Sequence, residues 1–600
     1  MGKRVLMVVL AALFAFSAIA FAACSHVHSL VEVAATEATC TQEGNIAHYK
    51  CSECGELFSD AEGKTPLSEA DVVIGKKAHD FEYTYDDAEH TKTCTACDLT
   101  VTEPHAGKAI EGRNVGHIYK SVCDCGYVVE YEVIPVISIN TEGGVEITGD
   151  MHSAEYFDCT VSVSGCDEEY KLTDAVGRVK VRGNYSANYD KKPYKIKFDD
   201  KQVMLGVNED LKAKEWVLLA DYKDKSLLRN PTAQYLAGEL LGEDGYYSAD
   251  SRYVEVNVNG TYRGLYLLTE QQEVREERVN VPEPEDPEDY DEGSEEWEAA
   301  MNEIHTGYFV EMDAYADSEV ALERFYITYK NGCKYADGKN TTRTLMSKYA
   351  IKSKVYSQAQ NDFIRKVIEN TYAVLADAVY NDHTDLAADP YLRLDGDGNI
   401  IEDTSLKTER EAVEASLALD SLVDTFILNE ICMDMDVGWS SFLMSIDMSE
   451  EGEKKLRFEA PWDWDSSLGF DVDETDGIYT CMPYKGNSVS GTPKGYDNPW
   501  LNLLSSKQWF RDEVAVRWGE LDERGVFDES VARLDELSTV YKAEIDDNFD
   551  LWAQCLNVAE GNSEYNAIRT QEAAKEHLKD FLEARYEFLR SIFVVGDDWI

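Results

Sequence analysis

A short segment of alternating acidic and aromatic residues, PWDWD at residues 461–465, contains the clearest candidates for chemistry in this sequence. If the segment continues the preceding strand in an extended conformation, Asp463 and Asp465 point to the same side. Trp462 and Trp464 then point to the opposite side and keep the site partly dry. Two carboxylates this close together bind a divalent cation or raise each other's pKa. The segment therefore predicts a metal site.

A second acidic pair, Asp434 and Asp436, follows an amphipathic helix expected at residues 419–431. In a loop, one carboxylate could accept a hydroxyl proton while the other positions it. A capping loop or a Ca²⁺-like loop would use the same residue types, so both interpretations stay open at this stage.

A glycine turn that carries Arg182 leads towards a strand with two lysines. In the alternating sequence YKIKF at residues 194–198, Lys195 and Lys197 lie on one face and the apolar side chains on the other. The backbone N–H groups and ammonium charges of such an arrangement can hold phosphates. A solvated strand face is the alternative explanation.

A third segment, DYKDKSLLRN at residues 221–230, follows the apolar strand WVLLA and passes into a helix. Ser226 is the expected cap of that helix. Arg229 and Asn230 are interpreted as structural tethers.

Strands dominate the first part of the large C-terminal region, and helices dominate its second part. The clearest hairpin spans residues 253–268, where Asn259 and Gly260 supply a turn with positive φ. Residues 281–300 are rich in acidic residues and proline, which predicts an insertion outside the core. Helical spacing of apolar residues is found around residues 363–375, 419–431 and 502–593. The order of elements predicts an α+β domain with two lobes at residues 133–600.

The whole chain of 600 residues is strongly acidic, with a formal net charge of −58. Such a polyanion is repelled by nucleic-acid phosphates and by anionic membrane surfaces, so neither is an expected partner. Cations are its natural counter-partners, although solubility outside the cell is the simpler explanation of the charge.

The N-terminus predicts export, because Lys3 and Arg4 precede an apolar run and a small-residue cleavage pattern. Residues 1–23 are therefore the expected signal peptide. Cys24 follows two alanines, as in a bacterial lipoprotein box, so lipid attachment at Cys24 is one possible outcome. An uncleaved anchor is the alternative. We expect a cell-surface or extracellular protein that meets a membrane only through a signal or lipid anchor.

Residues 25–130 predict two small Cys/His-rich, zinc-ribbon-like modules. Their cores are small, so we expect a bound metal or disulfides to stabilise them. Closely spaced thiolates can face one zinc ion, whereas exported cysteines commonly form disulfides, so both interpretations stay open. The segment resembles short Cys/His repeats of bacterial surface proteins, which suggests a spacer or attachment role. The candidate zinc ligands are Cys51, Cys54, Cys94, Cys97, Cys123 and Cys125.

In their order along the chain, these motifs resemble the CotH family, which is named for the spore coat protein H kinase. They are RGN followed by KKPYKIKF, the segment WVLLA…DKSLLRN, the hairpin VEVNVNGTYRGLYLLTEQ, the D-x-D loop and PWDWDSSLGF. The resemblance spans residues 135–475, and the trailing helices fit the same domain. It implies an atypical protein-kinase-like fold, with a strand-rich N-lobe, a helical C-lobe and ATP between them. It also implies secreted or coat proteins as phosphoacceptors.

The resemblance further implies roles for individual residues. Asp436 corresponds to the catalytic-loop aspartate that orients the acceptor hydroxyl, and Asp463 to the aspartate that holds Mg²⁺ or Mn²⁺. Lys195 or Lys197 would face the nucleotide phosphates. Glu270 would pair with that lysine.

One position departs from the kinase pattern. Kinases place an asparagine, a second metal ligand, five residues after the catalytic aspartate, and counting from Asp436 gives Ser441. Either Asp465 takes over this role or the domain no longer catalyses. The sequence thus predicts an exported ATP-dependent protein kinase or, alternatively, a non-catalytic CotH-like surface protein for adhesion, coat or scaffold assembly.

Overall fold

The structure is a computed structural model whose chain forms two compact units. The first unit is Met1–Ala106 with Cys123–Tyr127, and the second is Gly107–Val122 with Val128–Ile600. The predicted signal peptide and Cys24 lie outside the described residues. The structure describes residues 27–86, 88–105, 107–109, 120–131, 134–150, 153–183, 185–208, 211–329, 345–434, 437–472, 475–478 and 498–596.

The first unit consists of small antiparallel sheets. One sheet has the order β1-β3-β4-β5, a second pairs β2 with β6, and a third has the order β7-β8-β9. Short strands with exposed faces bury little apolar surface, so these sheets cannot be stabilised by a large core. The elements are β1 (Leu30–Val33), β2 (Gly44–Asn45), β3 (His48–Cys51), β4 (Leu57–Phe58), β5 (Pro66–Leu67), α2 (Glu69–Val72), β6 (Val73–Ile74), β7 (Phe81–Tyr85), β8 (Glu89–Cys94) and β9 (Thr100–Pro104).

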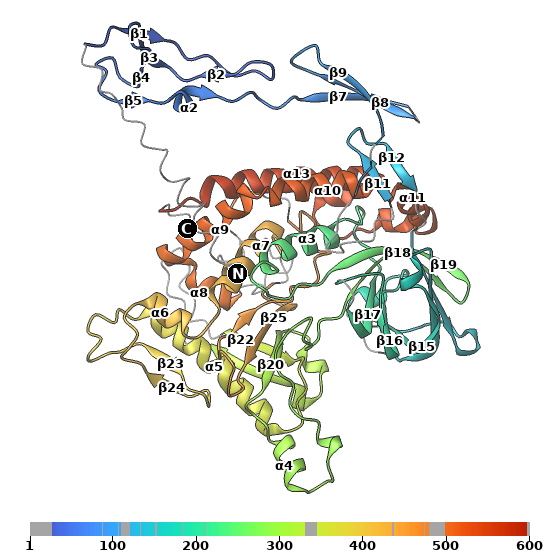
Figure 1. The fold of residues 1–600 in the computed structure, drawn as a ribbon. Helices are drawn as coiled ribbons and strands as arrows, with labels where there is room; N and C mark the ends of the chain where they lie inside the picture. The colour runs from blue at the N-terminus through green and yellow to red at the C-terminus, as the bar shows by residue number, and fades with distance from the viewer. Residues whose placement is uncertain are drawn as a thin grey trace, which may run out of the picture. The chain divides into compact units, whose positions relative to one another are not determined.

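A closed seven-stranded barrel begins the main part of the second unit (Figure 1). Alternation along β16 places Tyr194, Ile196 and Phe198 in the barrel core, as the sequence predicts. The expected turn at Asn259 and Gly260 joins β18 to β19, with φ values of 51° and 74°. The strands, in barrel order, are β13 (Val136–Thr141), β14 (Phe157–Ser164), β15 (Leu172–Val181), β16 (Tyr194–Val203), β17 (Lys212–Leu219), β19 (Thr261–Glu270) and β18 (Ser251–Val258).

A five-stranded sheet follows, in the order β21-β22-β20-β25-β26. Its strands are β20 (Gly307–Met312), β21 (Arg324–Tyr329), β22 (Leu345–Ile351), β25 (Phe442–Asp447) and β26 (Arg457–Phe458). Smaller sheets contain β10 (Gly107–Ala109), β11 (Lys120–Cys123) and β12 (Val128–Tyr131), and β23 (Leu392–Leu394) and β24 (Ile400–Glu402).

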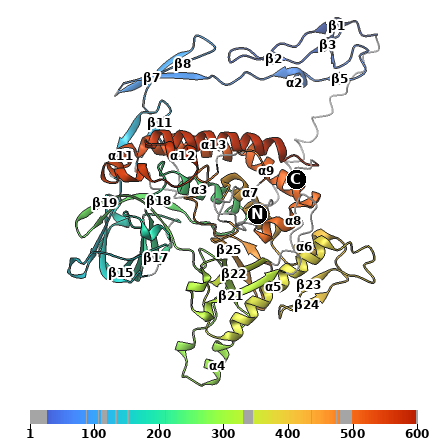
Figure 2. The same ribbon diagram turned by 180° about the vertical axis from the view of Figure 1, so that it is seen from behind.

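Helices pack against this sheet and against one another (Figures 1 and 2). Helix α5 contacts β21, α7 contacts β26, and α7 also packs against α3 and α13. Most barrel strands precede the long helices, whereas α5 and α7 precede β25 and β26. The mixture of helices and sheets agrees with the predicted α+β class. The helices are α3 (Arg229–Leu241), α5 (Gln358–Tyr380), α6 (Glu409–Glu414), α7 (Leu419–Cys432), α8 (Pro499–Ser505), α9 (Gln508–Glu523), α10 (Val526–Val540), α11 (Lys542–Leu551), α12 (Ser563–Ala567) and α13 (Gln571–Ile592).

Two local predictions need correction. Leu228, not Ser226, is the N-cap of α3; the Ser226 hydroxyl donates to Asp224 and accepts from the Leu228 N–H. The acidic segment 281–300 contains a short 3₁₀ helix, η4 (Pro287–Asp289), and most of α4 (Glu295–Met301), so it is more ordered than a bare loop. Among the described residues, no helix is both long and apolar enough to cross a bilayer.

Buried ion pairs connect elements that are distant in the sequence. Arg585 of α13 donates to Glu430 of α7 at 2.7 Å, and both side chains are fully buried. The predicted tether Arg229 is also fully buried, and it pairs with Asp224 at 2.5 Å. Asn230 donates to Asp221 and accepts from the Trp464 N–H, so both tether predictions are confirmed.

Candidate functional site

A cleft of about 720 Å³ is lined by residues of the barrel and of the five-stranded sheet, and we call it the charged cleft. From the barrel side it receives the end of β15, part of β16 and the loop after β17. From the sheet side it receives β20, the residue after β22, the start of β25 and residues 462, 463, 465 and 466. A volume of this size suits a small-molecule ligand.

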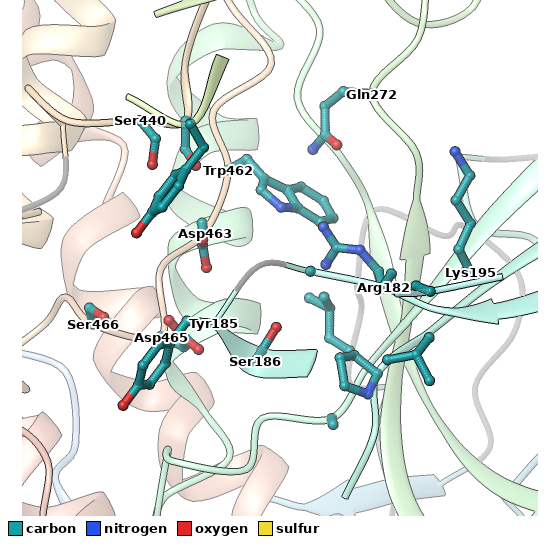
Figure 3. A pocket seen from close by; sticks show the side chains of 18 of the residues that line it. Arg182, Tyr185, Ser186, Lys195, Gln272, Ser440, Trp462, Asp463, Asp465 and Ser466 are labelled. Atoms are coloured by element: carbon teal, nitrogen blue, oxygen red, sulfur yellow. The ribbon is translucent and has the colours of Figure 1, made fainter. Parts of the chain in front are cut away.

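Cationic side chains reach the charged cleft from the barrel. Arg182 directly follows β15, and its guanidinium carbon lies 5.3 Å from the centre of the Trp462 ring (Figure 3). Burial lowers the pKa of Arg182, although the carboxylates of Asp463, Asp465 and Glu311 act in the opposite direction. Because three carboxylates face this one guanidinium, Arg182 stays charged.

The predicted metal-site aspartates both line the charged cleft. Lys223 Nζ lies 3.0 Å from Asp465 Oδ1 and also donates to the Ser466 hydroxyl. Burial alone would lower the pKa of Lys223, but the carboxylates of Asp465 and Asp463 outweigh burial and raise that pKa. The acidic segment is therefore partly neutralised by the protein itself.

The expected extended conformation of this segment is wrong. Ala460 and Asp463 have positive φ values of 61° and 73°, which interrupt the alternation of side chains. As a result Trp462 lines the charged cleft together with the aspartates, and only Trp464 is buried behind them. Non-glycine residues in this backbone region cost free energy and often occur at functional sites.

The sheet side contributes charged residues that sequence reasoning missed. Glu311 of β20 pairs with Lys352 at 2.8 Å and accepts a hydrogen bond from the Ser441 N–H at 3.0 Å. Burial, followed by the nearby Glu311 carboxylate, raises the pKa of Asp313 to about 6. The available signal was a glutamate inside the otherwise apolar strand Gly307–Met312, since a charge in a buried strand needs a reason.

The two lysines of β16 share one partner, which the sequence did not identify. Lys195 and Lys197 lie 2.5 Å and 2.6 Å from the two carboxylate oxygens of Glu215. Burial raises the pKa of Glu215, but the two ammonium groups outweigh burial and hold it below its usual range. Among the described residues, the lining of the charged cleft includes Lys195 but not Lys197.

The expected pairing of Glu270 with one of these lysines is wrong. Glu270 pairs with Arg278 at 3.0 Å, and both side chains are fully buried. It also accepts hydrogen bonds from the Asn208 amide and from the Asp250 N–H. Gln271 and Gln272, which follow β19, line the charged cleft, whereas the contacts of Glu270 connect the barrel to the loop that carries Arg278.

The D-x-D loop is described only in part. Asp434 is buried and lines a separate small cavity of about 20 Å³ together with Trp462 and Trp464. Asp436 lies outside the described residues. Ser441, which has a positive φ of 60°, lines both cavities.

The first unit contains three groups of cysteines and histidines whose ligand atoms all lie within 4.8 Å of one another and could hold a metal ion. All six predicted cysteine ligands fall into these groups. The sequence prediction missed the histidines and Cys40, because they come from outside the paired-cysteine turns. The groups are Cys40, His79, Cys94 and Cys97; His90, His105, Cys123 and Cys125; and His28, Cys51 and Cys54.

The charged cleft offers two kinds of ligand chemistry at once. Asp463, Asp465 and Glu311 supply the oxygen ligands that Mg²⁺ and Mn²⁺ prefer. Arg182 and Lys223 supply donors for phosphate oxygens. The donor set therefore fits a polyphosphate together with a divalent cation.

Comparison with known proteins agrees with this donor set. The model of the CotH kinase protein family matches residues 179–589, which is more than half of the chain and includes the whole acidic segment. A search of curated proteins found no match. The chain belongs to the CotH kinase protein family.

Proposed function

We propose that this protein is an exported, ATP-dependent protein kinase of the CotH type, with the charged cleft as its nucleotide site. Its substrates would be secreted or cell-surface proteins. One observation carries the proposal: Asp463, Asp465, Arg182 and Lys223 converge in a single cleft although they come from three distant segments. The barrel would then act as the N-lobe, and the sheet with its helices as the C-lobe.

The cationic residues would bind the nucleotide phosphates. Arg182 is held against the Trp462 ring, so its planar donors are already oriented when a phosphate arrives. Gly183 follows with a φ of 85°, and a Cβ atom there would lie 2.3 Å from the Ser186 hydroxyl oxygen. The backbone at this turn can therefore come close to a phosphate. Lys195 would add a further charge at the edge of the cleft.

The acidic residues would hold the divalent cation. Asp463 and Asp465 are the ligands we assign, and the cation would neutralise charge on the phosphate oxygens during transfer. Lys223 would leave Asp465 for a phosphate when both ligands are bound. Asp436 stays a prediction as the residue that orients the acceptor hydroxyl.

Autophosphorylation with labelled ATP and Mn²⁺ tests the proposal. We expect label on the wild-type protein and on Asp382→Ala, because Asp382 is an exposed residue that does not line the charged cleft. We expect none on Asp463→Ala. An unlabelled wild-type protein, or equal labelling of Asp463→Ala, would contradict the kinase assignment.

A second candidate function is a non-catalytic surface protein for adhesion, coat or scaffold assembly. It is favoured by Ser441, a weak metal ligand at the position of the kinase asparagine, and by Lys223, which already neutralises Asp465. Thermal unfolding separates the two functions. A nucleotide site stabilises the fold by about 2.7 kcal/mol when ATP with Mn²⁺ is present at a hundred times its Kd. An unchanged Tm under these conditions favours the second function.

A further inference from the structure

Cys40, His79, Cys94 and Cys97 have the spacing of a tetrahedral metal site. The sulfurs of Cys40 and Cys94 are 3.9 Å apart. His79 Nδ1 lies 3.4 Å from the Cys94 sulfur and 3.5 Å from the Cys97 sulfur. Zinc bonds of about 2.3 Å to sulfur and about 2.0 Å to nitrogen place neighbouring ligand atoms about 3.3–3.8 Å apart. We call this group the first centre.

A second group has the same dimensions. His90 Nδ1 lies 3.3 Å from the Cys123 sulfur, and His105 Nδ1 lies 3.3 Å from the Cys125 sulfur. All four ligand atoms lie within 4.8 Å of one another. We call this group the second centre. The 3.9 Å between the sulfurs of Cys40 and Cys94 is much longer than a disulfide bond of about 2.05 Å, so these two thiols are not joined to each other.

His105 carries an independent sign of metal binding on its other ring nitrogen, because its Nε2 lies 2.7 Å from the backbone oxygen of Asp86. His90 Nε2 lies 3.2 Å from the Glu103 carboxylate, which is an ion-pair distance without a hydrogen bond. Metal-binding histidines typically donate this second N–H to a carboxylate or a carbonyl oxygen, which fixes the tautomer and aims the other nitrogen at the ion. In both histidines it is Nδ1 that faces the thiols.

The backbone also supports a thiolate at the first centre. The Ala96 N–H donates to the Cys94 sulfur at 3.5 Å, within the turn that joins Cys94 to Cys97. Such a bond stabilises the charged form of sulfur, which is the form that binds metals.

Each centre combines ligands from two consecutive modules. We define three modules within the first unit, residues 27–75, 79–105 and 123–127. The first centre contains three ligands of the second module and Cys40 of the first. The second centre contains Cys123 and Cys125 of the third module together with His90 and His105 of the second. Neither centre is complete within a single module.

We propose that both centres bind zinc and that each ion joins two consecutive modules. Mixed nitrogen and sulfur ligands in tetrahedral array favour zinc over harder cations. Modules with so little buried apolar surface gain their folding free energy from such ions. The metal thus fixes the order of the modules as well as the fold of each, which a disulfide inside one module would not do.

Native mass spectrometry of the full chain, purified with zinc under reducing conditions, tests this proposal by counting bound ions. We expect at least two ions on the wild type. We expect one ion fewer on Cys40→Ser and one fewer on His90→Ala, because each variant removes a ligand that belongs to the preceding module.

His48→Ala is the matched control, because His48 is also buried and stands just before a cysteine pair, yet its Nδ1 lies 2.8 Å from the Ile46 backbone oxygen. This variant should keep the wild-type number of ions. Fewer than two ions on the wild type would overturn the proposal. So would a lower ion count for His48→Ala, or a loss other than one ion for Cys40→Ser or His90→Ala. A wild-type chain with oxidised cysteine pairs and no ion overturns it as well.

A further variant tests Glu103, which lies beside His90 but is not itself a proposed zinc ligand. Glu103→Ala should weaken zinc binding at the second centre by about 10- to 100-fold in competition with a chromophoric chelator. Glu62→Ala, which changes an exposed glutamate outside the three groups, should leave the affinity unchanged. Equal affinities of the two variants would contradict the role of Glu103 as the partner that orients His90.

Discussion

The two units of this protein differ in what stabilises them. The second unit buries whole tryptophan side chains, such as Trp216 and Trp500, inside extended apolar cores. The first unit, where it is described, buries few apolar residues besides cysteine. These are Ala38, Leu57, Phe58 and Val72. An apolar core of ordinary size can support the second unit alone, whereas the first unit depends on its cysteine and histidine groups.

The two units also differ in whether their charged and electron-donating groups are paired within the protein. In the charged cleft, cations and carboxylates pair with each other, as Lys223 does with Asp465 and Lys352 with Glu311. The site can therefore exist before any ligand arrives. In the first unit the converging groups are all electron-pair donors, with no opposite charge among them. Under the zinc proposal a cation completes each of these groups, whereas the charged cleft is partly neutralised by its own side chains.

Breaking a buried ion pair should produce the largest effect on the second unit. Glu430→Ala leaves Arg585 buried without its carboxylate, which should lower the free energy of unfolding by about 3–5 kcal/mol. Urea unfolding, followed by tryptophan fluorescence, measures the change. The loss should be the same with and without a zinc chelator, because no proposed zinc ligand lies in the second unit.

Asp546→Ala is the control for this prediction, since its pair with Lys542 is exposed. It should change the free energy of unfolding by less than about 1 kcal/mol. If a chelator alone destabilised the second unit as strongly as Glu430→Ala does, the proposed difference between the units would be wrong.

A buried carboxyl group makes the second unit sensitive to pH. Burial, and then the Asp224 carboxylate, raise the pKa of Asp221 from 3.8 to about 7 in the folded state. The folded state therefore holds this proton more tightly than the unfolded state does. The resulting stabilisation is complete below about pH 4 and is lost as the pH rises through about 7, at about 1.4 kcal/mol for each unit of pKa difference.

Asp221→Asn should remove this dependence while keeping the oxygen that accepts from Asn230. Urea unfolding at pH 4.5 and pH 8 should show the variant gaining stability relative to wild type at the higher pH. The raised pKa of Asp313 is common to both proteins and cancels in the difference. Parallel pH profiles would mean that folding does not raise the pKa of Asp221.

Features with a local cause could be predicted from the sequence. Alternation alone placed both lysines of β16 on one face, and Asn259 with Gly260 defined the hairpin. The class of fold followed from the order of strands and helices. These predictions hold because period and turn chemistry act over a few residues.

Features that depend on distant segments could not be predicted. Glu270 pairs with Arg278 and also accepts from Asn208, which lies 62 residues earlier, and no local pattern carries that information. The positive φ of Asp463 brought Trp462 into the cleft, and Glu311 came from a strand about 150 residues earlier. Cys40 was missed as a ligand for the same reason, since its partners lie more than 35 residues away.

Removing the ammonium group of Lys223 should increase the affinity of the charged cleft for a divalent cation, as expected for a group of donors with no cation among them. Lys223→Ala leaves Asp465 and Asp463 without their ammonium partner, so Mn²⁺ alone should bind about tenfold more tightly. ATP, which would lose a phosphate contact, should bind more weakly. Isothermal titration measures both affinities. Lys192→Ala is the control, because Lys192 donates to the Ala187 backbone oxygen and does not line the cleft. Unchanged Mn²⁺ affinity would contradict self-neutralisation.

The smallest effects should come from the two lysines that share Glu215. Lys195→Ala should weaken ATP binding several-fold, whereas Lys197→Ala should not, because only Lys195 of this pair lines the charged cleft.

Each single variant should cost at most about 1 kcal/mol of stability, since Glu215 keeps one ammonium partner. The double variant leaves a largely buried carboxylate without either partner. Its loss of stability in urea should therefore exceed the sum of the two single losses. Additive losses would mean that Glu215 does not need a cation, and that this pairing of charges contributes little to stability.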